Sequence, residues 1–241
     1  MKFKEIDIDW YSPYKPIAVE ESVLSESLSR DEAIALDIGD KAKERWATLL
    51  WRTNCVTTMV ERIMEPIPTD CIRRAIICCV DSTREEGVVL GHDGICTVFL
   101  RYDPWPIMEL GDLGRKEMTA DIILRGMDVL ERETGLDASE VRRACALARE
   151  AGFESRWVWR RRRSPSGMTA EVEVDQDTER LRIWMTVYSR RGQMLRRALM
   201  VEREPDSWGL RYRHLGDLRW EGDTAVVEAE SGFRYELDMS L

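Results

Sequence analysis

Hydrophobic and polar residues follow two different spacings along this chain, and the change falls near residue 152. Before it, most apolar positions recur every three or four residues, the spacing of one face of an amphipathic helix. After it, they alternate with polar residues in short runs separated by turn residues, which indicates antiparallel strands. The pattern predicts an α+β protein. Residues 1–152 should form a mostly α-helical part with a few strands, and residues 153–241 an antiparallel β-meander, packed together as one unit.

Three helices are predicted in the first half of the helical part. Ser29 and Glu32 form a capping box, and the helix that they begin should end near Asp37. A long amphipathic helix should follow over residues 40–64, where Pro66 and Pro68 end it. Thr69 is placed to cap a third helix, because the apolar residues between 72 and 80 also fit one helical face.

Two further helices are predicted over residues 114–133 and 138–151. The second has the clearest local signals in the chain. Asp137 should act as its N-cap, with Glu140 completing a capping box, and Gly152 stands where a C-terminal glycine belongs.

Strands are predicted wherever short runs alternate between apolar and polar residues. In the first part they cover residues 5–10, 87–90 and 95–102. In the second part they cover residues 153–162, 168–175, 180–188, 193–203, 208–214, 224–230 and 233–238. The last three are short, and we expect them to be too thin for an independent sandwich.

Charge divides the chain at the same point as the spacing. The 241 residues carry a formal net charge of −9. Residues 1–152 hold 29 acidic and 20 basic side chains, whereas residues 153–241 hold 16 of each. Phosphates attract a net basic surface, so binding of nucleic acid by the whole chain is disfavoured, and a basic protein partner suits the acidic part better.

Targeting signals and cysteines favour a cytoplasmic protein. Acidic residues appear from Glu5 onward and no apolar run of a signal peptide follows, so no signal peptide is expected. The longest apolar run, residues 75–80, is far shorter than the roughly 20 residues of a membrane span. Six cysteines in a chain of this length are expected to be buried thiols, with no disulfides.

Few residue patterns point to catalysis. His92 lies four residues before Cys96, but Cys96 falls inside a predicted apolar strand, where a thiol is usually inert packing. Cys78 and Cys79 are adjacent and cannot chelate one ion together. Phosphate-binding, zinc-protease and nucleophile-elbow motifs are absent from the sequence. We predict no catalytic residues, no metal site and no cofactor.

The strongest basic feature is the run Arg160-Arg161-Arg162-Arg163, which follows Trp157 and Trp159. It could act as a phosphate clamp with stacking aromatic residues. The favoured interpretation is structural. Both tryptophans should face the core, Arg160 and Arg162 should lie on the other face of the strand, and acids at 171, 173 and 175 should face the arginines across a hairpin.

A rigid acidic loop is the candidate contact surface. Prolines at 104 and 106 restrict it, and its contact residues are predicted to be Asp103, Trp105, Glu109 and Asp112. Interfaces favour aromatic anchors, and rigid loops lose little entropy on binding. The structural alternative is that Trp105 folds back over the core beside the start of a helix.

The sequence therefore supports one main hypothesis and two alternatives, and no motif assigns it to a known family. The main hypothesis is a non-catalytic protein that binds a basic protein, such as an immunity protein that occludes the active site of a toxin domain. The first alternative is an enzyme with dispersed acid/base residues in a cleft between the helical part and the sheet. The second is a nucleic-acid-binding module that uses the arginine run.

Overall fold

The computed structural model describes residues 1–10, 23, 27–38, 41–80, 84–205 and 214–240. Contacts divide the chain into two compact units, Met1–Phe153 and Glu154–Leu241. Each unit has its own sheets and its own hydrophobic core.

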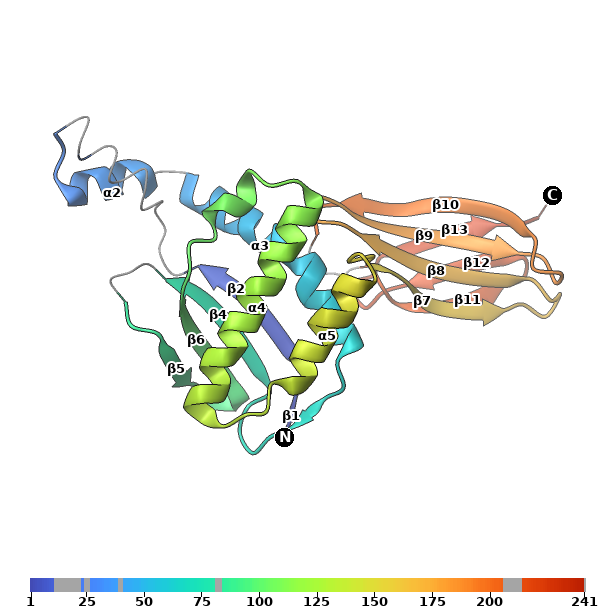
Figure 1. Cartoon of the computed structure of the whole chain (residues 1–241). Helices are drawn as coiled ribbons and strands as arrows, with labels where there is room; N and C mark the ends of the chain where they lie inside the picture. The colour runs from blue at the N-terminus through green and yellow to red at the C-terminus, as the bar shows by residue number, and fades with distance from the viewer. Residues whose placement is uncertain (11–22, 24–26, 39–40, 81–83, 206–213, 241) are drawn as a thin grey trace. The chain divides into compact units, whose positions relative to one another are not determined.

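A four-stranded mixed sheet forms the centre of the N-terminal unit (Figure 1), with strand order β2-β4-β6-β5. Its strands are β2 (Glu5–Trp10), β4 (Arg74–Val80), β6 (Ile95–Arg101) and β5 (Gly87–Leu90). β2, β4 and β6 run parallel, and β5 pairs antiparallel with β6. A separate two-stranded pair joins β1 (Lys2–Phe3) to β3 (Ile67–Pro68). The carboxyl ends of three parallel strands therefore lie along one edge of the sheet.

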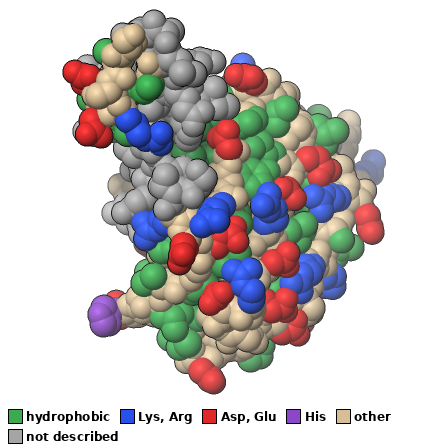
Figure 2. All heavy atoms as spheres, turned by 60° about the vertical axis from the view of Figure 1, so that its left-hand side comes forward, with side chains coloured by type: hydrophobic (Ala, Val, Ile, Leu, Met, Phe, Trp, Pro, Cys, Tyr) green, Lys and Arg blue, Asp and Glu red, His purple; other side chains and the backbone are tan. Residues whose placement is uncertain are grey.

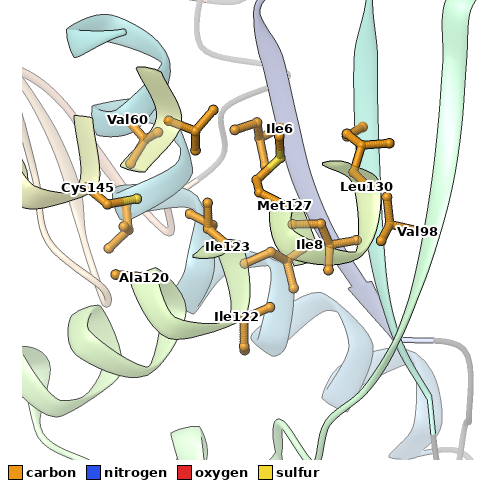
Figure 3. Packing of buried hydrophobic residues seen from close by; sticks show 14 of the residues in the cluster. Ile6, Ile8, Val60, Val98, Ala120, Ile122, Ile123, Met127, Leu130 and Cys145 are labelled. Carbon is orange, nitrogen blue, oxygen red and sulfur yellow. The ribbon is translucent and has the colours of Figure 1, made fainter. Parts of the chain in front are cut away.

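Two helices, α3 (Lys41–Ile63) and α4 (Asp112–Thr134), pack on one face of this sheet, and α5 (Ser139–Glu150) packs against both of them (Figure 1). Their apolar faces share one core with the inner face of the strands, where Ile6, Ile8 and Val98 lie toward Met127 and Leu130 of α4 (Figure 3). The other face of the sheet carries a small separate cluster, Cys78, Val80 and Phe99. The remaining helix, α2 (Arg30–Ile38), precedes α3.

The predicted helix after Thr69 is wrong, because residues 74–80 form β4. The hydroxyl of Thr69 caps no helix. It accepts the N–H of Ile72 at 3.1 Å and donates to the carbonyl of the same residue at 2.5 Å, forming a tight turn. β4 lies between two parallel neighbours and is buried on both faces, so its apolar run carries no alternation that would distinguish it from a helix. The expected mostly helical first part is corrected accordingly: helices and sheets are both present, but the strands are not confined to the C-terminal part.

The other predicted helices are present, and hydrogen bonds at the starts of two of them test the predicted caps. Ser29 and Glu32 form the predicted reciprocal box, with the Ser29 N–H 2.9 Å from Glu32 Oε2 and the Glu32 N–H 3.3 Å from Ser29 Oγ. At α5 the N-cap residue is Ala138 and not Asp137, which lies one residue earlier and accepts the Ser139 N–H at 2.8 Å. Glu140 does not complete that box, because its Oε1 accepts the N–H of Glu65 at 2.6 Å instead.

The C-terminal unit is a two-layer antiparallel sandwich (Figure 1). One layer has strand order β10-β9-β8-β7 and the other β11-β12-β13. The strands are β7 (Arg156–Arg163), β8 (Thr169–Gln176), β9 (Leu181–Tyr188), β10 (Met194–Arg203), β11 (Asp217–Glu221), β12 (Thr224–Glu228) and β13 (Arg234–Asp238). The two layers share one core, so the last strands do form a second sheet, contrary to expectation. β11 was not predicted, and the expected strand 208–214 lies almost entirely outside the described residues.

Side chains form hydrogen bonds between the two layers along both sides of this sandwich. Trp159 donates its indole N–H to the carbonyl of Gly216 at 3.3 Å, and Trp220 donates to the carbonyl of Arg162 at 3.1 Å. On the other side, Arg196 donates to the carbonyl of Asp238 at 2.7 Å. These bonds satisfy edge-strand carbonyls that would otherwise be open to pairing with another chain.

Candidate partner-binding surface

The predicted contact loop begins where β6 ends, at the carboxyl edge of the parallel sheet. Asp103 accepts the N–H of Trp105 at 3.1 Å, and a short 3₁₀ helix, η2 (Trp105–Met108), follows. Ligands of open α/β sheets bind preferentially outside this edge. The sequence interpretation could not place the loop there, because it had assigned β4 to a helix.

Trp105 is not an exposed anchor, as only 7% of its surface is accessible. Its ring packs edge-to-face on Trp10, with centroids 5.2 Å apart and planes at 69°. The structural alternative for Trp105 therefore holds, since the side chain covers the core beside the start of α4. Burying an indole in an aromatic pair stabilises more than exposing it on a loop.

The three predicted acidic contacts are exposed: Asp103, Glu109 and Asp112. Asp112 begins α4 and pairs with Lys116 at 2.7 Å. Leu113, the next residue, is 60% exposed, the largest value among the exposed large hydrophobic residues described. We call Asp103, Glu109, Asp112 and Leu113 the acidic corner.

Hydrogen bonds fix the backbone of the acidic corner. The Glu109 N–H donates to the carbonyl of Pro106 at 3.0 Å, and the buried Arg115 donates its Nε–H to the carbonyl of Ile107 at 3.2 Å. The corner is therefore shaped before any partner arrives.

A tyrosine and an aspartate tie β6 to α4 behind the loop. The hydroxyl of Tyr102 donates to Asp121 Oδ2 at 3.1 Å, and the guanidinium of Arg125 lies 4.9 Å from the centre of the tyrosine ring. Burial, followed by the Asp121 carboxylate, raises the pKa of Tyr102 to about 12. The phenol stays protonated at neutral pH and acts as a structural donor.

Five of the six thiols are buried among packing residues, but Cys71 is exposed, so the expectation that all six are buried is wrong for that residue. All six cysteines are free. Burial raises the pKa of Cys96 to about 11, of Cys145 to about 11 and of Cys78 to about 12, so these thiols carry almost no thiolate at neutral pH. Among the residues that the structure describes, no cluster of three or more histidine, cysteine or acidic side chains is placed to hold a metal ion.

Within the described residues, Arg161 and Arg162 of the arginine run pair with carboxylates, but the faces of the run differ from the prediction. Arg161 lies 2.6 Å from Glu171, as the predicted cross-strand pairing requires. A register shift between Val158 and Arg160 inserts one extra residue into β7, so Arg160 and Arg162 lie opposite buried Val172 and Ala170. Directly opposed residues share a face, so these two arginines are on the inner face at the edge of the sandwich. The predicted opposite placement is wrong because one bulged residue inverts the alternation.

One carboxylate that the sequence interpretation passed over lies at the edge of the N-terminal sheet. Glu61, near the end of α3, accepts the N–H of Ile6 on β2 at 2.9 Å. Burial raises its pKa to about 7, and Asp7 and Glu5 add to the shift. Its position between the buried residues Thr57 and Met64 on one helix face was the available signal.

Charges of both signs are interspersed over one face of the molecule (Figure 2). The net charge therefore does not form a single-sign field on that face, and local arrangements decide what can bind. Among the described residues, no helix is long and apolar enough to cross a membrane.

Comparison with known proteins adds no assignment: no protein-family model matches the chain, and no curated protein or solved structure is significantly similar to it.

Proposed function

We propose that this chain is a non-catalytic protein that binds another protein of basic surface through the acidic corner. The observation that carries the proposal is the corner itself, in which three exposed carboxylates accompany a leucine that is 60% exposed. An apolar contact beside carboxylates suits a partner that presents an apolar recess surrounded by lysine or arginine.

Rigidity supports this proposal. Pro104 and Pro106 restrict the backbone, and the bonds from Glu109 and Arg115 hold the turn before contact is made. Binding through a fixed surface loses less conformational entropy than ordering a flexible loop. Trp105 contributes from beneath by fixing the loop on the core, and Leu113 takes the role of the exposed apolar contact.

A basic nuclease-type toxin domain is the class of partner that fits this chemistry best. The active site of such a domain attracts phosphate and is therefore basic, so an acidic protein can occlude it. The chain would then act as an immunity protein, with a steric and electrostatic mechanism of inhibition.

Capture followed by kinetics tests the proposal. The full chain, tagged at its C-terminus, would capture partners from native lysate at low salt, and a salt step would release them. Association of the purified partner would then be compared between the wild type and the triple variant D103K/E109K/D112K. We expect association to slow by about tenfold or more at low salt, and by much less at high salt.

A matched control separates the corner from overall charge. The triple variant D70K/E85K/E150K changes the net charge by the same amount at three exposed acids of the same unit. Equal slowing in both variants would show a whole-chain charge effect and overturn the corner as the binding site. An unchanged rate in D103K/E109K/D112K would do the same.

A further inference from the structure

A hollow of about 590 Å³ opens along one side of the C-terminal sandwich. It lies where the edge strand β7 meets the start of β11, and it is lined by Trp159, Arg160, Leu215, Gly216, Asp217, Glu228 and Glu230. This volume falls in the range of sites that take small ligands or single side chains. It belongs to a different unit from the acidic corner, so the two can be tested separately.

The hollow has an indole wall that is held in place. Trp159 is the extra residue of the β7 bulge, and its indole N–H is bonded to the carbonyl of Gly216. Gly216 permits a close approach of the chain here, since a Cβ atom would lie 1.7 Å from the carbonyl oxygen of Glu228. A β-bulge commonly changes the direction in which the side chain of the bulged residue, here Trp159, points.

The lining is acidic, although the unit as a whole is charge-balanced. Three acidic residues and one arginine among the lining residues give a formal charge of −2. Glu228 is engaged by Arg219 at 2.5 Å, whereas the Asp217 carboxylate is 4.0 Å from Arg162 with 66% of its side chain exposed. Glu230 is exposed as well. Asp217 and Glu230 therefore remain accessible to a ligand.

The contact of Arg160 with Trp159 shows that this indole ring accommodates a guanidinium group. Its guanidinium lies 5.2 Å from the centre of the Trp159 ring, and within the described part of the chain it pairs with no carboxylate. A planar guanidinium stacks on an indole better than an ammonium does, and its flat donor array suits carboxylates.

We propose that this hollow binds the arginine side chain of a peptide or protein. The methylene stem would lie along Trp159, and the guanidinium would donate to Asp217 and Glu230. Arg160 lies in the same hollow and repels the incoming cation, so it weakens binding. A phosphate ligand is disfavoured, because it would face three carboxylates and one arginine.

Nuclear magnetic resonance of the full chain tests this site with a small probe. N-acetyl-L-argininamide carries the guanidinium with both ends neutralised, and N-acetyl-L-glutaminamide is its uncharged counterpart. We expect the arginine probe to shift the Trp159 indole N–H signal saturably, with a dissociation constant of about a millimolar. The glutamine probe should leave the signal in place. No saturable shift with the arginine probe, or equal shifts with both probes, would overturn the proposal.

Three variants make the test specific. D217N/E230Q should weaken binding about fivefold or more, and the control D223N/E204Q, which neutralises two exposed acids of the same unit, should not. R160Q should bind the probe several-fold more tightly, because it removes the competing cation.

Inorganic phosphate serves as the opposing probe. A saturable shift of the Trp159 signal by phosphate that R160Q abolishes, or weaker argininamide binding by R160Q, would identify an anion site and refute the proposal. Preserved spectral dispersion verifies the fold of each variant.

Discussion

The two units use carboxylates in different ways. In the N-terminal unit, Glu61 and Glu140 accept backbone N–H groups of segments 55 and 75 residues away. Glu140 also pairs with Arg143 of its own helix. In the C-terminal unit, Glu171 and Glu202 pair with Arg161 and Arg182 of neighbouring strands. Helices laid on a parallel sheet leave edge and terminal N–H groups that need acceptors, whereas a meander satisfies most of its backbone through its own ladder. The difference shows that carboxylates can stabilise a fold either by accepting backbone N–H groups or by pairing with side chains across a sheet.

The largest expected effect is on the free energy of unfolding, when alanine replaces one of two glycines, one in each unit, that lie close to other residues of the chain. At Gly216 a Cβ atom would meet the backbone of Glu228 at 1.7 Å, and at Gly126 of α4 it would meet the side chain of Ile77 at 2.6 Å. Backbone cannot move aside as a side chain can. We expect G216A to lower the free energy of unfolding by about 3 kcal/mol or more. G126A should cost about 0–2 kcal/mol, because alanine also favours the helix.

Urea unfolding of both variants, followed by circular dichroism, measures this difference. A G216A protein as stable as the wild type would contradict the tight junction of β11 with β12. A G126A protein that loses more than G216A would reverse the comparison.

The second prediction is a pH dependence that comes from the N-terminal unit. The pKa of Glu61 is about 7 in the folded chain, against an ordinary value of 4.5. The folded state therefore holds this proton more tightly, so the contribution of Glu61 to stability falls as the pH rises from about 4.5 to 7 and is constant above that. The loss is at most about 3 kcal/mol. E61Q keeps an acceptor for the Ile6 N–H without the charge and should be more stable than the wild type at pH 8.

Unfolding curves at pH 5 and pH 8 test the Glu61 prediction. The expected result is a smaller pH dependence in E61Q than in the wild type. E61A, which removes the acceptor, should be destabilised at both values. If E61Q were less stable than the wild type at pH 8, burial would not be the dominant influence on this carboxyl group.

The smallest expected effects are the losses of unfolding free energy when one carboxylate is removed from each unit. E140A removes the acceptor of the Glu65 N–H together with an exposed ion pair to Arg143 and should cost about 1 kcal/mol, whereas E202A removes only exposed ion pairs and should cost less than about 0.5 kcal/mol. In 0.5 M salt the E202A effect should vanish, because the salt screens exposed charges. Salt also screens the Arg143 ion pair that E140A removes, but the bond to the Glu65 backbone N–H is lost at any salt concentration, so most of the E140A effect should persist. Equal effects of both substitutions at both salt concentrations would remove the proposed distinction.

The acidic corner was predicted in part. Asp103, Glu109 and Asp112 are exposed, as contact residues must be, since acidic residues are almost never fully buried unless they are paired. The orientation of Trp105 was undetermined, because an indole on a short loop can point either way until the core beneath it is known. Leu113 was not singled out, because the predicted helix began at residue 114, whereas α4 begins at Asp112 and carries Leu113 in its first turn.

The sequence by itself determined the elements whose two faces differ. Alternation located most strands of the sandwich, helical spacing located α3, α4 and α5, and local chemistry located the Ser29 cap, because each signal depends on residues close together in the chain. Only the tertiary structure decided the rest. β4 is buried on both faces and loses its periodicity, and one bulged residue reverses the arginine run. Trp159 lines a hollow only because β7 meets β11, more than 50 residues later in the chain. Those outcomes depend on contacts between distant segments, which local spacing does not encode.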